Sequence, residues 1–166
     1  MATKRAIKSA RGQTADVTEL WARIREGAPS GYYCVALLGL RNYEPLRIAA
    51  TVEKGLAYST LLRLERNSTL PAATIAESAQ ISPRTLARRK KSGKLEPDES
   101  DRLVRVSRII ARAMELFEGD TAATRVWLSS RQAALGGAVP LEFAKTDVGA
   151  REVDNLIGRL EHGIPT

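Results

Sequence analysis

The segment from residue 96 to residue 119 constrains the fold more than any other part of the chain. It opens with EPDESD, and negative charge at the start of a helix is stabilised by the helix macrodipole. The apolar residues that follow recur at spacings of three and four, which predicts a long helix ending at Glu118-Gly119. We expect a surface helix with its apolar side packed inward. The apolar side carries Leu103, Val106, Ile110, Ala113, Met114 and Phe117, and the other side carries Arg102, Arg105, Arg108 and Arg112.

This row of arginines allows two interpretations. It can be a solvated face, as most charged rows are, or it can contact a partner protein or a DNA backbone. The spacing alone favours neither.

Helical spacing extends to most of the remaining chain. Residues 16–27 carry an amphipathic pattern, and further helices are expected over 45–55, over 58–67 and from residue 71 to 79. The apolar run at 32–40 is too short to show a period, so it fits either a strand or a buried helix. Almost nothing else favours a sheet, and the predicted fold class is all-α.

The last 47 residues predict a compact helical end to the chain. Asp120 or Thr121 should cap a helix, paired glycines at 136–137 should form a tight turn, and Pro140 should begin a one-turn helix. Thr146 or Asp147 should cap the final helix. We expect core positions at Val126, Trp127, Leu128, Val148, Val153, Leu156, Ile157 and Leu160, with Arg151, Asp154, Asn155, Arg159 and His162 more exposed.

A basic helix precedes the acidic segment. Residues 82–94 carry six basic side chains and no acidic one. Ser82 is a suitable N-cap, Pro83 fits the first helical position, and Leu86 should point back to the core. With the short helix at 71–79 and a turn at Gln80-Ile81, this helix forms a candidate helix-turn-helix unit.

Such a helix suits the major groove of DNA, because arginine pairs with guanine and lysine with phosphate. The alternative is a solvated basic helix with no ligand. The absence of acidic partners and the preceding short helix favour DNA. The candidate DNA-binding residues are Ser82, Arg84, Thr85, Arg88, Arg89, Lys90 and Lys91.

Composition argues against catalysis. Cys34 is the single cysteine and lies in an apolar run, which is typical of an inert buried thiol. His162 is the single histidine and stands four residues from the end, so no zinc site or catalytic triad can be assembled in the usual way. We predict a protein that is not an enzyme and needs no cofactor and no metal.

Charge and hydropathy favour a cytoplasmic protein with a polyanionic partner. The chain of 166 residues holds 26 Lys and Arg against 19 Asp and Glu. Its longest apolar run, 32–40, is too short to cross a bilayer, and the basic start lacks the apolar run of a secretory signal. Residues 1–14 are expected to be a disordered basic tail.

Several separate blocks in one order make the chain similar to a known family. The string RTLARR…L…ESDRLVRVSRIIARAMELFEG…A…WL…ALGG…PLEFAKTDVGAREVDNLIGRLEHG closely resembles the Xre/MbcA/ParS antitoxins, which pair with RES-domain toxins. The resemblance is strong over 81–163, weaker over 43–80, and does not cover 1–40. It implies a DNA-binding helix-turn-helix region, a toxin-binding domain, a homodimer, and repression of the protein's own operon.

The resemblance also implies that the C-terminal segment closes the active site of an NAD-consuming toxin. The sequence is then divided into the tail at 1–14, a helical region with the helix-turn-helix at 15–95, and a toxin-binding domain at 96–166. A dimeric helix-turn-helix regulator without a toxin is the alternative, and a regulator that senses a small molecule is a third class. The candidate partner-binding residues are Arg151, Asn155, Arg159, His162, Gly163, Ile164 and Thr166.

Overall fold

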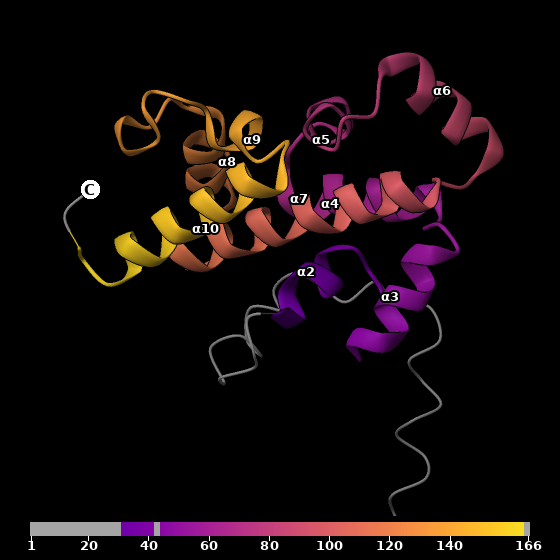
Figure 1. The fold of residues 1–166 in the computed structure, drawn as a ribbon, viewed down its shortest axis with the longest axis horizontal. Coiled ribbons are helices and arrows are strands. Elements are labelled where there is room, and N and C mark those ends of the chain that lie inside the picture. Colours follow the sequence, from indigo (N-terminus) through magenta and orange to yellow (C-terminus); the bar gives the residue numbers. More distant parts are fainter. Residues whose placement is uncertain (1–30, 42–43, 165–166) are drawn as a thin grey trace, which may run out of the picture.

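The computed structural model describes residues 31–41 and 44–164, and within these ranges the chain is helical, as expected for the all-α class (Figure 1). The tail at 1–14 and the helix expected over 16–27 lie outside the described residues. The described part contains no strand, and its only β-pairings are isolated bridges between Ala57 and Lys94 and between Gln132 and Ala138. The helices are α2 (Gly31–Leu37), α3 (Pro45–Glu53), α4 (Tyr58–Ser68), α5 (Ala72–Ser78), α6 (Pro83–Ser92), α7 (Pro97–Leu116), α8 (Thr121–Ser129), the 3₁₀ helix η1 (Ala133–Leu135), α9 (Pro140–Phe143) and α10 (Asp147–Glu161).

Helix α7 is the axis of the molecule. It packs against α2, α3, α4 and α5 as well as α8 and α10, and Figure 1 shows α10 running along it. The predicted apolar side is buried except for Phe117, which is half-buried just after the helix, but the expectation of a surface helix is wrong. Val104, Ile109 and Ala111, which lie outside that side, are buried as well. A helix with neighbours around most of its circumference buries more than one stripe.

The ambiguous run at 32–40 forms a helix rather than a strand. Tyr33, Val35 and Leu37 are buried, and α2 packs against α7 and α4. The chain leaves α2 through Gly39 at φ 66°, a conformation that favours glycine. A side chain at this position would also collide with the Arg63 side chain, whose Nη1 donates to the Gly39 carbonyl at 2.9 Å.

Two of the predicted core positions are wrong. In α8 the buried stripe is Thr124 and Leu128, so Val126 points away from it and is 61 % exposed. In α10 the stripe begins at Gly149-Ala150 and continues through Val153, and Val148 stands one residue before it with 73 % exposed. Helical rotation of about 100° per residue separates each valine from the stripe beside it.

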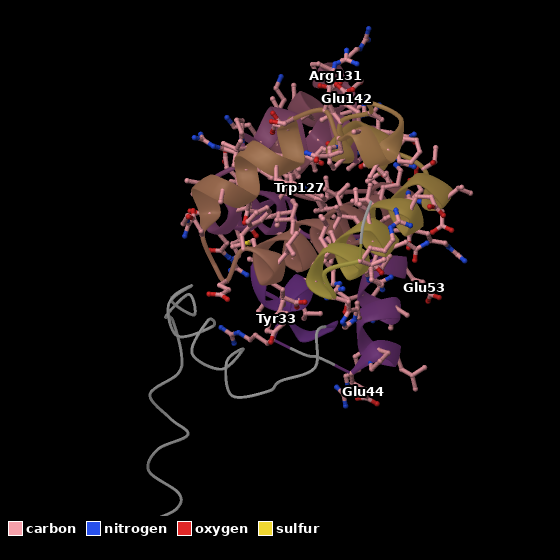
Figure 2. The ribbon with its side chains drawn as sticks, turned by 90° about the vertical axis from the view of Figure 1, so that its left-hand side faces the viewer. Tyr33, Glu44, Glu53, Trp127, Arg131 and Glu142 are labelled. Atoms are coloured by element: carbon pink, nitrogen blue, oxygen red, sulfur yellow. The ribbon has the colours of Figure 1, made fainter. Side chains whose placement is uncertain are left out.

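The other core predictions at this end are confirmed or nearly so. Leu128, Val153, Leu156 and Ile157 are buried, while Leu160 is half-buried. Trp127 packs partly buried against the core, and its ring centroid lies 6.2 Å from that of Phe117. Figure 2 shows Trp127 within the bundle and Arg131 and Glu142 at its edge.

Candidate nucleic-acid and partner interfaces

The predicted cap of the basic helix α6 is present. The Ser82 hydroxyl accepts the Thr85 backbone N–H at 3.2 Å, and Pro83 occupies the first turn. The helix ends at Gly93, whose left-handed φ of 73° reverses the chain. The Gly93 carbonyl accepts the Tyr58 backbone N–H at 2.9 Å, and this hydrogen bond joins the end of α6 to the start of α4.

The turn between α5 and α6 is built without glycine. Gln80 takes a left-handed φ of 56°, and the Ile81 N–H closes the turn on the Ala76 carbonyl at 2.8 Å. Ala79 and Ile81 are buried, which anchors the turn to the core. Leu86 is half-buried and packs against the core, as predicted. The result is a short helix, a tight turn and a second helix that projects from the body (Figure 1).

The outer face of α6 is a set of unpaired cations. Arg84, Arg88, Lys90 and Lys91 are exposed, and none of them forms an ion pair within the described part of the chain. No acidic side chain of the described residues therefore competes with an anionic ligand on this face. This arrangement is suited to phosphate and base-edge contacts.

Arg89 differs from its neighbours. Its guanidinium binds the Glu99 carboxylate through Nε at 2.8 Å and Nη2 at 3.0 Å, and its Nη1 lies 2.9 Å from Glu96. Only 11 % of the Arg89 side chain is exposed. Hydrogen bonding to Glu99 raises the pKa of Arg89 above its ordinary value. These contacts fix α6 on α7 and leave Arg89 less available to DNA than Arg84 or Arg88.

Glu99 was missed as a structural residue in the sequence. It is 5 % exposed, and besides Arg89 it accepts the Glu96 backbone N–H at 2.9 Å, which completes a capping box. The acidic segment therefore does more than complement the dipole. The available signal was a Glu three residues after the cap of α7, close in sequence to a basic helix lacking acids.

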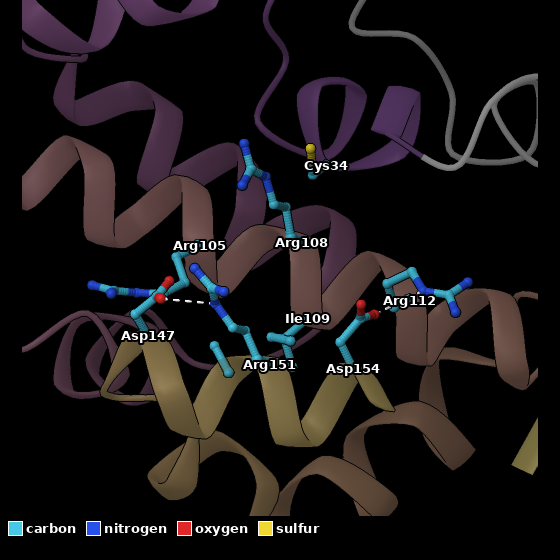
Figure 3. A pocket seen from close by; sticks show the side chains of 9 residues that line it. Cys34, Arg105, Arg108, Ile109, Arg112, Asp147, Arg151 and Asp154 are labelled. Atoms are coloured by element: carbon cyan, nitrogen blue, oxygen red, sulfur yellow. Dashed lines mark hydrogen bonds and ion pairs between the residues drawn. The ribbon is translucent and has the colours of Figure 1, made fainter. Parts of the chain in front are cut away.

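The arginines of α7 do not form one row in solvent. Arg102 donates to the Ala79 carbonyl at 2.7 Å and so holds the end of α5. Arg112 binds Asp154 and Glu161 of α10, with Nη2 2.9 Å from the Glu161 carboxylate. Two of the four arginines are thus internal connectors, and Arg105 and Arg108 face a groove between α7, α10 and α2 (Figure 3).

The candidate partner residues of α10 share one face. Arg151, Asn155, Arg159 and His162 stand at spacings of four, four and three, and all are exposed except Arg159, which is half-buried. The exposed Val148 extends the same face by one turn towards the start of the helix. We define these five residues as the α10 outer face.

The chain turns as it leaves this helix. Gly163 takes a left-handed φ of 64°, and the Ile164 N–H donates to the Arg159 carbonyl at 2.9 Å. Ile164 is 50 % exposed. Thr166, the last of the predicted partner residues, lies outside the described residues.

Cys34 is buried, as predicted for an inert thiol, and burial raises its pKa while the nearby Arg108 opposes the shift. A thiol held protonated is a poor nucleophile. No helix in the described ranges is both long and apolar enough to cross a membrane.

Two family models match consecutive parts of the chain. Residues 47–108 match the antitoxin Xre-like helix-turn-helix domain, and residues 112–163 match the antitoxin Xre/MbcA/ParS C-terminal toxin-binding domain. The first match contains the α5–α6 unit and the second contains the α10 outer face. The two matches meet inside α7.

Curated proteins of the same kind are similar over most of their length. Antitoxin Xre of Yersinia enterocolitica is 34 % identical over 128 residues, which is 76 % of this chain and 86 % of that protein. Antitoxin Xre of Photorhabdus laumondii is 35 % identical over 116 residues, 69 % of this chain and 78 % of that protein. Antitoxin Xre of Pseudomonas putida is 31 % identical over 118 residues, 70 % and 72 % of the two chains.

Proposed function

Because the chain belongs to the Xre antitoxin family, we propose that it is the antitoxin of a type II toxin–antitoxin pair that blocks a RES-domain, NAD-consuming toxin. The family is one of regulatory antitoxins, and the chain is not an enzyme. The observation that carries the proposal is the α10 outer face, which is exposed except for the half-buried Arg159 and is followed by a turn at Gly163 and the exposed Ile164.

The chemistry of this face suits a site that normally holds a dinucleotide. Asn155, Arg159 and His162 offer hydrogen-bond donors and Val148 offers an exposed apolar contact. Beyond Gly163 the chain adds the exposed Ile164 side chain, which offers a second apolar contact.

The same protein is proposed to repress its own operon through α6. Its exposed Arg84 and Arg88 meet DNA, and a homodimer in the cytoplasm presents two such helices to two half-sites. We assign DNA binding to the region 15–95 and toxin binding to the region 96–166. The close pairing of Arg89 makes it a positioning residue for α6 in this scheme.

The test measures two activities on the same variants. A chain truncated after His162 and an Asn155→Ala, Arg159→Ala double variant are assayed for inhibition of the cognate toxin's NAD consumption and for operator binding. Both should lose inhibition and keep operator binding. The truncation is placed after His162 so that Glu161 remains in the chain, because the Glu161 carboxylate accepts two hydrogen bonds from Arg112.

A matched control is Arg125→Ala, which removes an exposed arginine from α8 and should leave both activities unchanged. Full inhibition by both the truncated chain and the double variant would refute blockade by the α10 outer face. Absence of any NAD-consuming partner, with operator binding intact, would favour a regulator without a toxin.

A further inference from the structure

The groove between α7, α10 and α2 shares a single residue, Arg151, with the α10 outer face, and its other lining residues have no part in the proposed function. Its volume is about 550 Å³, and its walls bring four arginines and two aspartates together (Figure 3). We call it the Arg groove. The charged residues lining it are Arg105, Arg108, Arg112, Arg151, Asp147 and Asp154.

Two of these arginines are neutralised within the protein. Arg112 binds Asp154 at 3.0 Å as well as Glu115 and Glu161, so it serves as a wall of the groove. Arg151 pairs with Asp147 at 2.9 Å. That pair is exposed on both sides, and exposed pairs contribute little, so an anion in the groove can compete for Arg151.

Arg105 and Arg108 remain as an uncompensated pair of positive charges. Neither makes an ion pair with any residue in the described ranges. They stand one turn apart on α7, and Arg108 points towards α2 and Cys34 (Figure 3). The groove therefore carries a local excess of two positive charges.

Arg105 also has an unsatisfied donor. Its Nε is buried and has no hydrogen-bond partner among the described residues. A buried donor without a partner costs roughly 1–3 kcal/mol, and more for a charged group. An oxyanion in the groove would supply the missing acceptor, and arginine forks bind such groups bidentately.

The size of the groove narrows the class of ligand. Small-molecule sites commonly measure about 300–1,000 Å³, so the groove exceeds what a bare phosphate ion needs. Ile109 and Ala150 add apolar wall suited to an organic moiety. DNA is a poor candidate, because Figure 1 places α6 and α2 on opposite sides of α7.

We propose that the Arg groove binds a small organic phosphate through Arg105 and Arg108. Calorimetry on the full chain with AMP, glucose 6-phosphate and inorganic phosphate tests this. At least one of the two organic phosphates should bind more tightly than inorganic phosphate. Arg108→Gln, a change at an exposed position, should weaken that binding about tenfold or more, since it removes charge-assisted hydrogen bonds.

Arg105→Gln should have the same effect, with circular dichroism to check the fold, and Arg105→Lys should restore only part of the affinity because it lacks the fork. The matched control Arg125→Gln removes one exposed charge from α8 and should leave phosphate binding unchanged. Equal weakening by Arg125→Gln would overturn the proposal, as would inorganic phosphate binding as tightly as both organic probes. No binding of any probe at millimolar concentration would overturn it as well.

Discussion

The Arg89–Glu99 ion pair joins the helix that carries the exposed cations to the central helix α7. Glu99 also holds the first turn of α7 through the Glu96 N–H, so one carboxylate serves two helices. The position of α6 relative to the core thus depends on a residue outside the helix-turn-helix unit. The positions of Arg84 and Arg88 therefore depend on the Arg89–Glu99 contact, because both residues lie on α6.

Glu99→Gln should therefore destabilise the protein and weaken operator binding together. The amide cannot accept the bidentate pair, and loss of a cap interaction alone costs about 1 kcal/mol. Urea unfolding and an operator titration measure the two effects. The control is Glu96→Gln, because the Glu96 side chain is 56 % exposed and an amide oxygen can still accept the Glu99 N–H of the capping box. It should change both quantities much less. Equal effects of the two substitutions would contradict this account.

The Glu115 carboxyl group should make the free energy of unfolding depend on pH. Burial raises its carboxyl pKa above the usual range, although the Arg112 contact opposes the shift, and one of its oxygens is buried without a partner in the described residues. A raised pKa means that the folded state holds the proton more tightly than the unfolded chain. Its stabilising contribution is therefore complete below the unfolded pKa and is lost as the pH rises through the folded one.

Glu115→Gln should remove this dependence. The stability of the natural protein minus that of the variant should fall as the pH is raised from about 4 to about 7, across the usual carboxyl range. Urea unfolding at both pH values measures it. A difference that stays constant or increases with pH would show that burial does not control this carboxyl group.

Neighbouring residues of α8 should respond very differently to truncation. Leu128 is fully buried, so Leu128→Ala should cost about 2–5 kcal/mol of unfolding free energy. Val126 is 61 % exposed, and Val126→Ala should stay within about 0.5 kcal/mol. Denaturant unfolding of both variants measures the two free energies. A comparable loss of unfolding free energy in each variant would place Val126 in an interface of the protein in solution.

At the scale of the element, α6 should act through its exposed cations. Arg84→Ala and Arg88→Ala together should weaken operator binding and lower the slope of log affinity against log salt by about one unit for each phosphate that the variant no longer neutralises. Titrations at several salt concentrations measure the slope. Arg125→Ala on α8 removes an exposed charge elsewhere and should leave it unchanged. Unchanged affinity in the double variant would move the DNA-binding surface away from α6.

Local signals in the sequence predicted most elements. The Ser82 and Thr146 caps, Pro83 and Pro140 at helix starts, and the glycine turn at 136–137 are all present, because each depends on neighbours within a few residues. The run at 32–40 could not be assigned, since burial on all sides erases periodicity. Val126 and Val148 were misplaced because hydrophobicity alone does not tell which apolar residue faces the core.

The site was predictable to a lesser degree. The exposed cations of α6 follow from composition and helical spacing, as does the exposed face of α10. The roles of Arg102 and Arg112 could not be foreseen, because their partners Ala79 and Glu161 are brought near by folding. A basic side chain and its acidic partner on another helix leave no pattern in a single sequence.

At the scale of the whole molecule, the two family domains share one core. Buried residues of α2, α4, α5, α7 and α10 form a continuous cluster, and Lys145 reaches Glu77 at 3.0 Å across the two halves. The described part should unfold as one cooperative unit. Denaturant curves followed by circular dichroism and by tryptophan fluorescence should coincide.

The fragment 96–166 provides the complementary measurement. It would expose the faces of α7 that pack against α2, α3, α4 and α5, so we expect it to lack a cooperative transition. Stable, cooperative unfolding of the fragment, or two separate transitions in the full chain, would show that the halves are energetically independent.

The continuity of α7 also limits how such a protein can be recombined. Exchanging the helix-turn-helix half between relatives means cutting a helix rather than a loop, since the two family matches end at 108 and begin at 112. Each residue inserted there would rotate one half against the other by about 100° and shift it by about 1.5 Å. A chimera therefore has to keep the helical register, and lineages that exchange operator specificity are expected to conserve the length of this helix.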